Sequence, residues 1–158
     1  MCWGVGPAPA IIARNANALG INNIYMTQGA ASQKFIELAG DAANGIKLTA
    51  GRIIVADQLA DDDRYKKVLM DYKKSFEAKF SSHVSAFGGH AYDAFHLFRI
   101  AYENSKGDAS KLTGELEKIK GFIGIAGEFN LSANDHTGLT KDAFVIVEIK
   151  DGQFVLSE

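Results

Sequence analysis

The chain has 158 residues, of which 47% are hydrophobic, and 17 Lys and Arg against 19 Asp and Glu give it a net charge of −2. This length and apolar content suffice for one ordinary globular core, and the lack of a basic excess argues against binding to nucleic acid. The single cysteine, Cys2, excludes an internal disulfide and a cysteine metal cluster. No run reaches the ~20 apolar residues that cross a bilayer, and no export signal opens the chain.

The first 50 residues alternate short apolar segments with helical stretches. Apolar segments lie around residues 2–3, 24–26 and 46–48, and helices are predicted over Pro7 to Leu19 and Ser32 to Ala39. Pro7 suits the first turn of a helix, and Gly20 is placed to end it. Strands joined by single helices predict an α/β fold with a parallel, doubly wound sheet, in which ligands bind beyond the carboxyl ends of the strands.

After residue 50 the sequence predicts a connector, then a helical stretch, and then a tail of short strands. Residues 50–61 are predicted to form an extended connector into an acidic run at a domain boundary, whose carboxylates would favour the start of the next helix. Three helices follow, over about 64–80 with an aromatic face turned inward, from 90 to 102, and from Asp108 to Gly121. The tail predicts short strands at 129–131, 143–149 and 154–156. Asp151-Gly152 joins the last two as an antiparallel hairpin.

Two turns that follow predicted strands form the main candidate site. Gly4-Val5-Gly6-Pro7 opens a helix, where backbone N–H groups and the helix dipole can hold an anion, but it lacks the third glycine of a dinucleotide fingerprint. Thr27-Gln28-Gly29-Ala30-Ala31-Ser32 forms the next such turn, with Ser32 as a candidate helix cap. Because adjacent parallel strands end at one sheet edge, the two turns are expected to converge there.

Other reactive groups give no complete site. His90, Asp93 and His96 share one helix at spacings of three, but zinc normally takes three or four ligands, and a packed helix with one polar edge explains them better. Cys2 has no assignable base, and no serine stands in a Gly-x-Ser-x-Gly elbow. We therefore expect no enzyme activity, no metal and no cofactor.

Five segments together resemble a known family, with matching order and spacing over essentially the whole chain. They are Trp3–Ala10, Gln28–Ser32, Phe35–Gly45, Phe87–Ala94 and Gly138–Thr140. The sequence resembles the C-terminal half of the type I periplasmic binding proteins of leucine/isoleucine/valine ABC transport systems. The resemblance implies flavodoxin-like or Rossmann-like three-layer lobes, a small ligand in the cleft between them, and delivery of the closed form to a permease.

The resemblance also implies an incomplete two-lobe fold, truncated at its N-terminus, in a parent protein that is periplasmic or extracytoplasmic. Residues 1–55 and 140–158 would belong to the second lobe, and residues 56–139 would pack on the first. Such a piece would expose apolar faces and an unpaired sheet edge, so self-association is expected.

The site residues carry over in part. Ligand contacts are expected from Gly4, Val5, Gly6, Pro7, Gln28, Gly29, Ala30, Phe87 and His90. Where amino-acid-binding relatives place a tyrosine, this chain has Val5, and where they hold a glutamate against the ligand's ammonium it has Gln28. A neutral amide cannot form that ion pair, so the ligand is expected to be a small carboxylate, either a branched-chain amino acid or an aliphatic or aromatic acid without an ammonium.

Two other function classes fit parts of the sequence. A regulatory sensor of the same fold would differ in gene context, and a nucleotide-binding enzyme domain using Gly4–Pro7 would have affinity for a phosphate-bearing cofactor. Fold likeness alone does not decide between them.

Overall fold

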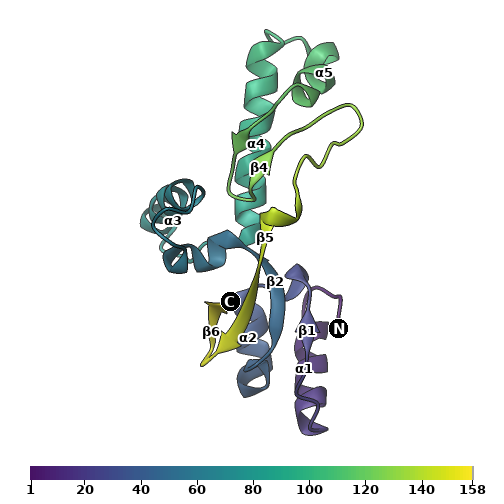
Figure 1. The fold of residues 1–158 in the computed structure, drawn as a ribbon, viewed down its shortest axis with the longest axis vertical. Helices are drawn as coiled ribbons and strands as arrows, with labels where there is room; N and C mark the ends of the chain where they lie inside the picture. The colour runs from purple at the N-terminus through teal and green to yellow at the C-terminus, as the bar shows by residue number, and fades with distance from the viewer. Residues whose placement is uncertain (158) are drawn as a thin grey trace. The chain divides into compact units, whose positions relative to one another are not determined.

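The computed structural model describes residues 1–157 and divides into two compact units. The first unit consists of Met1–Gln58 with Phe144–Glu158, and the second of Leu59–Ala143. In Figure 1 the first unit is drawn in purple, blue and yellow, and the second mainly in teal and green. Within residues 1–157, no helix has the length and apolar character of a membrane span.

A four-stranded sheet with two helices forms the first unit. Its elements are α1 (Ala8–Ala18), β1 (Tyr25–Met26), α2 (Gln33–Ala39), β2 (Lys47–Gly51), β5 (Phe144–Lys150) and β6 (Gln153–Leu156). The strand order is β1-β2-β5-β6, with β1 and β2 parallel and the other two pairings antiparallel. Cys2 adds a parallel bridge to Met26, which confirms the predicted parallel order of the three N-terminal segments.

Local sequence signals explain the turns of this unit. Ser32 caps α2 by accepting a hydrogen bond from the Phe35 N–H at 3.2 Å, as predicted. Gly20 follows α1 with a φ of 71°. Asp151 and Gly152 both have positive φ, 49° and 74°, which a two-residue type I′ turn requires. The predicted hairpin of β5 and β6 is therefore confirmed.

The core of the first unit lies between the sheet and its helices. Leu48, Val147 and Ile149 on the strands are essentially fully buried. They belong to one cluster with Ala10 and Ala13 of α1 and with Phe35 and Ile36 of α2. This packing fixes the positions from which the loops at the sheet edge depart.

The expectation of an extended connector after residue 50 was wrong. Strand β2 ends at Gly51, and Arg52–Gln58 forms 3-10 turns in which Ile53, Val55 and Ala56 are buried. Gln58 ties this segment to β6, donating from Nε2 to the Phe154 carbonyl and accepting from the Leu156 N–H, both at 2.8 Å. The run of β-branched residues favoured an extended conformation, but in the structure the backbone forms tight turns that bury these side chains.

The second unit is mainly helical. Its elements are α3 (Lys66–Phe80), α4 (Ala86–Asn104), α5 (Leu112–Glu117), β3 (Phe122–Ile123) and β4 (Glu128–Phe129). Ser85 caps α4 through the Gly88 N–H, and Asp108 accepts from the Ser110 N–H as the predicted cap before α5. A small core of Leu97, Ile119, Ala126, Phe129 and Leu131 lies beneath α4 and α5.

Four expectations for this unit need correction. Helix α5 ends at Glu117 rather than at Gly121, and the strand expected at 129–131 is the two-residue β4. The acidic run precedes α3 without entering its first turn, because Asp63 accepts from the Tyr65 N–H at 2.7 Å and Asp61 pairs with Lys66. The aromatic face of α3 is not buried, since Leu69 is its one fully buried residue.

Candidate functional site

Two loops leave the first unit at the carboxyl ends of neighbouring parallel segments. The Cys2 N–H donates to the Tyr25 carbonyl at 2.8 Å, and the Thr27 N–H donates to the Cys2 carbonyl at 3.2 Å. The first loop then runs over Gly4–Pro7 into α1, and the second over Thr27–Ala30 into α2. The hydrogen bonds at Cys2 therefore hold both loops to one edge of the sheet.

The two loops touch at Gly29. A Cβ on this residue would lie 2.7 Å from Cγ1 of Val5 and would overlap the carbonyl oxygen of Gly4. Side chains do not approach one another so closely, so glycine is required here for steric reasons rather than for its backbone angles. The convergence expected from the sequence is thus present: Gly4 and Val5 lie directly against Gly29.

The first loop presents backbone donors. Among residues 1–157, no hydrogen bond uses the N–H of Val5 or of Gly6, whose φ of 71° turns the chain into α1. The start of α1 is poorer in donors than most helices, because Pro7 and Pro9 have no N–H and the Ala10 N–H donates to the Pro7 carbonyl at 3.1 Å. Two adjacent N–H groups suit one carboxylate better than a diphosphate.

The second loop contributes a hydroxyl that was not singled out from the sequence. Thr27 Oγ1 is buried and has no hydrogen-bond partner in the described part of the chain. Buried hydroxyls are normally paired, and leaving one unpaired costs about 1–3 kcal/mol. Its position directly after a strand and before the Gln28 turn was the available signal, because polar residues at strand ends face ligands in such sheets.

The surroundings of the loops are apolar and uncharged. Trp3 and Val5 are 85% and 69% exposed, which is unusual for large apolar side chains. No charged side chain occurs in residues 1–13 or 21–33. The edge can therefore offer apolar contact and neutral hydrogen bonds, but these segments provide no ion pair.

The other two expected ligand contacts belong to the second unit. Phe87 and His90 both lie in the first turns of α4 and are exposed to solvent. The structure therefore groups the nine expected residues in two sets. Seven lie in the loop pair of the first unit, and two lie on one helix of the second.

Asp93, three residues beyond His90, has a structural role. Only 1% of the residue is exposed, and its carboxylate oxygens accept from the N–H groups of Ile125 and Ala126, both at 2.7 Å. Burial raises the pKa of Asp93 above 3.8, against the two backbone hydrogen bonds and the nearby His90 and His96, which lower it. The carboxylate anchors the loop before β4 to α4.

Two glycines make that anchor possible. A Cβ on Gly124 would lie 2.5 Å from the Asp93 carboxylate, and a Cβ on Gly89 would lie 2.5 Å from Cγ2 of Ile125. The Asp93 carboxylate is thus enclosed by backbone and apolar groups. In the described residues, no three His, Cys, Asp or Glu side chains are placed to hold a metal ion.

Comparison with known proteins gives structural relatives. Neither a family model nor a curated protein matches the sequence. An extracellular ligand-binding receptor from Rhodopseudomonas palustris is similar over 98% of this chain, with 29% identity and a TM-score of 0.84. A leucine-binding protein from Thermotoga maritima aligns over 99% of the chain, with 23% identity and a TM-score of 0.81.

A third structure was solved with a bound ligand. It is a branched-chain amino acid transporter substrate-binding protein from Streptococcus pneumoniae in complex with isoleucine, and it aligns over 96% of this chain with 21% identity and a TM-score of 0.76. The chain spans 46% of the Rhodopseudomonas receptor, 42% of the Thermotoga protein and 41% of the Streptococcus protein. It therefore corresponds to less than half of each relative.

Proposed function

Because the chain has the fold of the type I periplasmic binding proteins and spans less than half of its solved examples, we propose that it forms part of an extracytoplasmic solute-binding component of an ABC transporter. The names of the structural relatives, a ligand-binding receptor and amino-acid-binding proteins, support a solute-binding role. The observation that carries the proposal is the contact of the two loops at Gly29.

In this proposal the loop pair supplies one side of the ligand site. The N–H groups of Val5 and Gly6 bind a carboxylate, because both are without partners and lie beside the positive end of α1. Thr27 Oγ1 is the third candidate donor, since it is buried without a partner on a residue whose N–H donates to the Cys2 carbonyl, just before the first loop. Trp3 and the Val5 side chain would cover apolar parts of the ligand.

The proposed ligand class is a small aliphatic or aromatic carboxylate. A branched-chain amino acid also presents an ammonium, which needs an anionic or multiply accepting partner. The loop segments have no charged side chain, and Gln28 offers only an amide. Hydrogen bonds to a charged group contribute about 1.5–3 kcal/mol against roughly 1 kcal/mol for neutral ones, so an acid without an ammonium is the better match to this side of the site.

The partners follow from this role. A permease of the same transporter would receive the loaded protein, and the parent protein would act outside the cytoplasm. Phe87 and His90 remain candidate ligand contacts of the second unit, proposed from their sequence motif and from their exposure on α4.

Isothermal titration calorimetry with matched ligands tests the proposal. Leucine and 4-methylpentanoate share one carbon skeleton and differ in the ammonium, so the pair isolates its contribution. The protein is expected to bind 4-methylpentanoate more tightly than leucine and to bind the uncharged 4-methylpentanamide least. Equal dissociation constants for the acid and the amide would contradict the carboxylate site, and tighter binding of leucine would contradict the assignment of the ligand class.

A further inference from the structure

Strand β6 lies at one edge of the four-stranded sheet. In the strand order β1-β2-β5-β6 it has a strand on one side only, and Figure 1 shows it in yellow next to β5. Its residues Phe154, Val155 and Leu156 are apolar and uncharged, and Phe and Val favour strands. An edge strand of this composition is a template on which a further strand can add, so proteins commonly protect such edges.

The register of the β5–β6 hairpin decides which backbone groups of β6 face outward. Ser157 donates its N–H to the Ile146 carbonyl of β5 at 2.9 Å. Hydrogen-bonded and non-bonded pairs alternate along an antiparallel ladder, so Val155, two residues earlier, also bonds to β5. The N–H and C=O groups of Phe154 and Leu156 therefore face away from β5. We call these outward-facing backbone groups the β6 edge.

The side-chain amide of Gln58 binds to the β6 edge. Its Nε2 donates to the Phe154 carbonyl and its Oε1 accepts from the Leu156 N–H, both at 2.8 Å. A residue of a parallel strand lying opposite Val155 would make the same two bonds, because it donates to the carbonyl of the residue before and accepts from the N–H of the residue after. Gln58 therefore takes the hydrogen-bonding positions of an added strand.

The chemistry of the amide group suits both positions. An amide carries a donor and an acceptor, whereas an ionised carboxylate only accepts and an ammonium only donates. The partners also fix the orientation of the Gln58 amide, because a backbone carbonyl can only accept and a backbone N–H can only donate. Gln58 and its two partners all belong to the first unit, so the contact that closes the β6 edge is made within that unit.

We propose that Gln58 closes the β6 edge to further strands. While the amide holds the Phe154 carbonyl and the Leu156 N–H, an approaching strand has to displace it before it can pair. Without the amide, two copies of β6 complement each other. In an antiparallel pair with Val155 opposite its own equivalent, Phe154 of each copy forms a hydrogen-bonded pair with Leu156 of the other. In a solution of the pure chain, β6 of a second copy is therefore the strand that the freed edge binds.

Amide hydrogen exchange of the dilute 158-residue chain, resolved by NMR, tests whether Gln58 holds the edge. Gln58→Ala is expected to speed exchange of the Leu156 N–H by about tenfold or more, while the Val155 N–H, bonded to β5, changes by less than about twofold. Gln153→Ala is the matched control and should change neither rate, because Gln153 is an exposed glutamine of β6 whose side chain makes no hydrogen bond within residues 1–157. An unchanged Leu156 rate in Gln58→Ala, or equal acceleration at Leu156 and Val155, would overturn the proposal.

Raising the concentration tests whether the freed edge accepts a strand. At about 100 µM, chosen because a strand of four residues pairs weakly, Gln58→Ala is expected to sediment at a higher average mass than the native chain. Its Leu156 N–H is expected to regain protection at the same time, which locates the association at β6. Gln58→Glu puts a charge at the edge, which opposes strand addition, and is expected not to raise the mass. No gain in mass and protection for Gln58→Ala over Gln153→Ala, or equal association of Gln58→Ala and Gln58→Glu, would overturn the proposal.

Discussion

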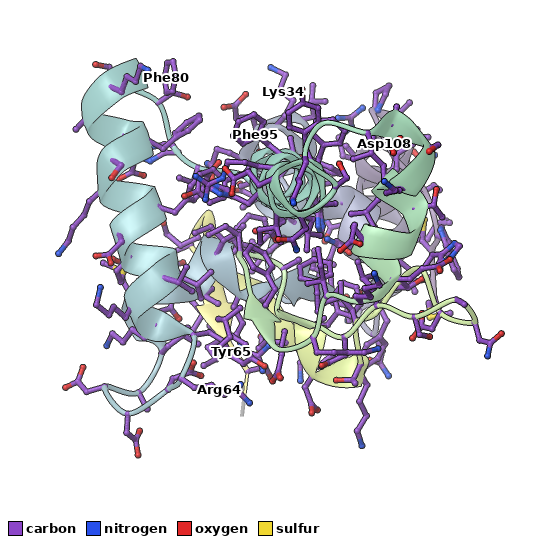
Figure 2. The ribbon with its side chains drawn as sticks, turned by 90° about the horizontal axis from the view of Figure 1, so that it is seen from above. Lys34, Arg64, Tyr65, Phe80, Phe95 and Asp108 are labelled. Carbon is purple, nitrogen blue, oxygen red and sulfur yellow. The ribbon has the colours of Figure 1, made fainter. Side chains whose placement is uncertain are left out.

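The two units of this chain bury their apolar residues in different ways. The first has a sheet whose central strands are covered, with Leu48, Val147 and Ile149 essentially inaccessible to water. The second has a small core beneath α4 and leaves Phe95, Phe98 and Tyr102 of that helix between 48% and 61% exposed (Figure 2, where Phe95 is labelled). The candidate ligand loops therefore rest on a well-packed base, whereas in the second unit the buried Asp93 carboxylate holds the loop before β4 to α4.

The largest expected effect is the loss of the Asp93 anchor. Asp93→Ala leaves the Ile125 and Ala126 N–H groups buried without an acceptor, and each such group costs about 1–3 kcal/mol. The free energy of unfolding, measured by urea denaturation, is expected to fall by about 3 kcal/mol or more. Asp93→Asn keeps one acceptor and should lose about half as much. A loss below about 1 kcal/mol for the alanine variant would show that the second unit does not rely on this anchor.

The second-largest expected effect is the loss of stability of the first unit when a single methyl group is added at Gly29. Gly29→Ala forces the loops apart, because the new Cβ would overlap the Gly4 carbonyl, and overpacking of this kind costs about 1–3 kcal/mol. Gly114→Ala on α5 is the control, since nothing lies within 4 Å of its Cβ, and replacing a helical glycine there should stabilise the fold by about 0.5–1 kcal/mol. Equal stability of the two variants in thermal denaturation would contradict contact between the loops.

Two serine caps allow a like-for-like comparison of the units. Ser32 accepts from the Phe35 N–H at 3.2 Å in the first unit, and Ser85 accepts from the Gly88 N–H at 3.1 Å in the second. Each serine-to-alanine change is expected to lower the free energy of unfolding, measured by chemical denaturation, by about 1 kcal/mol. A loss of unfolding free energy several times larger for Ser85→Ala than for Ser32→Ala would mean that the stability of α4 rests more on this cap than on its buried face.

The smallest expected effect is a pH dependence traced to Asp93. Burial raises the pKa of this carboxyl in the folded state, so folding takes up a proton. The stability that this group contributes is fully present below its unfolded pKa of 3.8 and is lost as the pH rises through the folded pKa. The difference in unfolding free energy between the native chain and Asp93→Asn should therefore narrow from pH 4 upward. A difference that widens over this range would show that the backbone hydrogen bonds outweigh burial.

Signals within a few residues predicted much of the fold. Gly20 ends α1, Ser32 caps α2, and Asp151-Gly152 makes the β5–β6 turn, because each acts on its own neighbours. The 52–58 segment was predicted incorrectly because burial of Ile53 and Val55 depends on contacts far along the chain. The aromatic face of α3 was predicted to be buried on periodicity alone, and a pattern does not show whether anything covers it.

The candidate site was predicted in outline. Convergence of the Gly4–Pro7 and Thr27–Ala30 loops follows from parallel strands ending at one edge, and the contact at Gly29 agrees with it. The unpaired Thr27 hydroxyl and the role of Asp93 were not predicted. Asp93 binds backbone groups 32 and 33 residues away, a partnership that spacing along a helix cannot reveal.

Fluorescence of Trp3 tests the central claim most directly. Trp3 is the one tryptophan of the chain, and it lies next to Gly4, 85% exposed. Titration with 4-methylpentanoate is expected to shift its emission in a saturable way, and Gly29→Val, which forces the loops apart, should abolish the shift while leaving the circular dichroism of the helices intact. No saturable shift in the native chain, or the same shift in Gly29→Val, would contradict a ligand site at these loops.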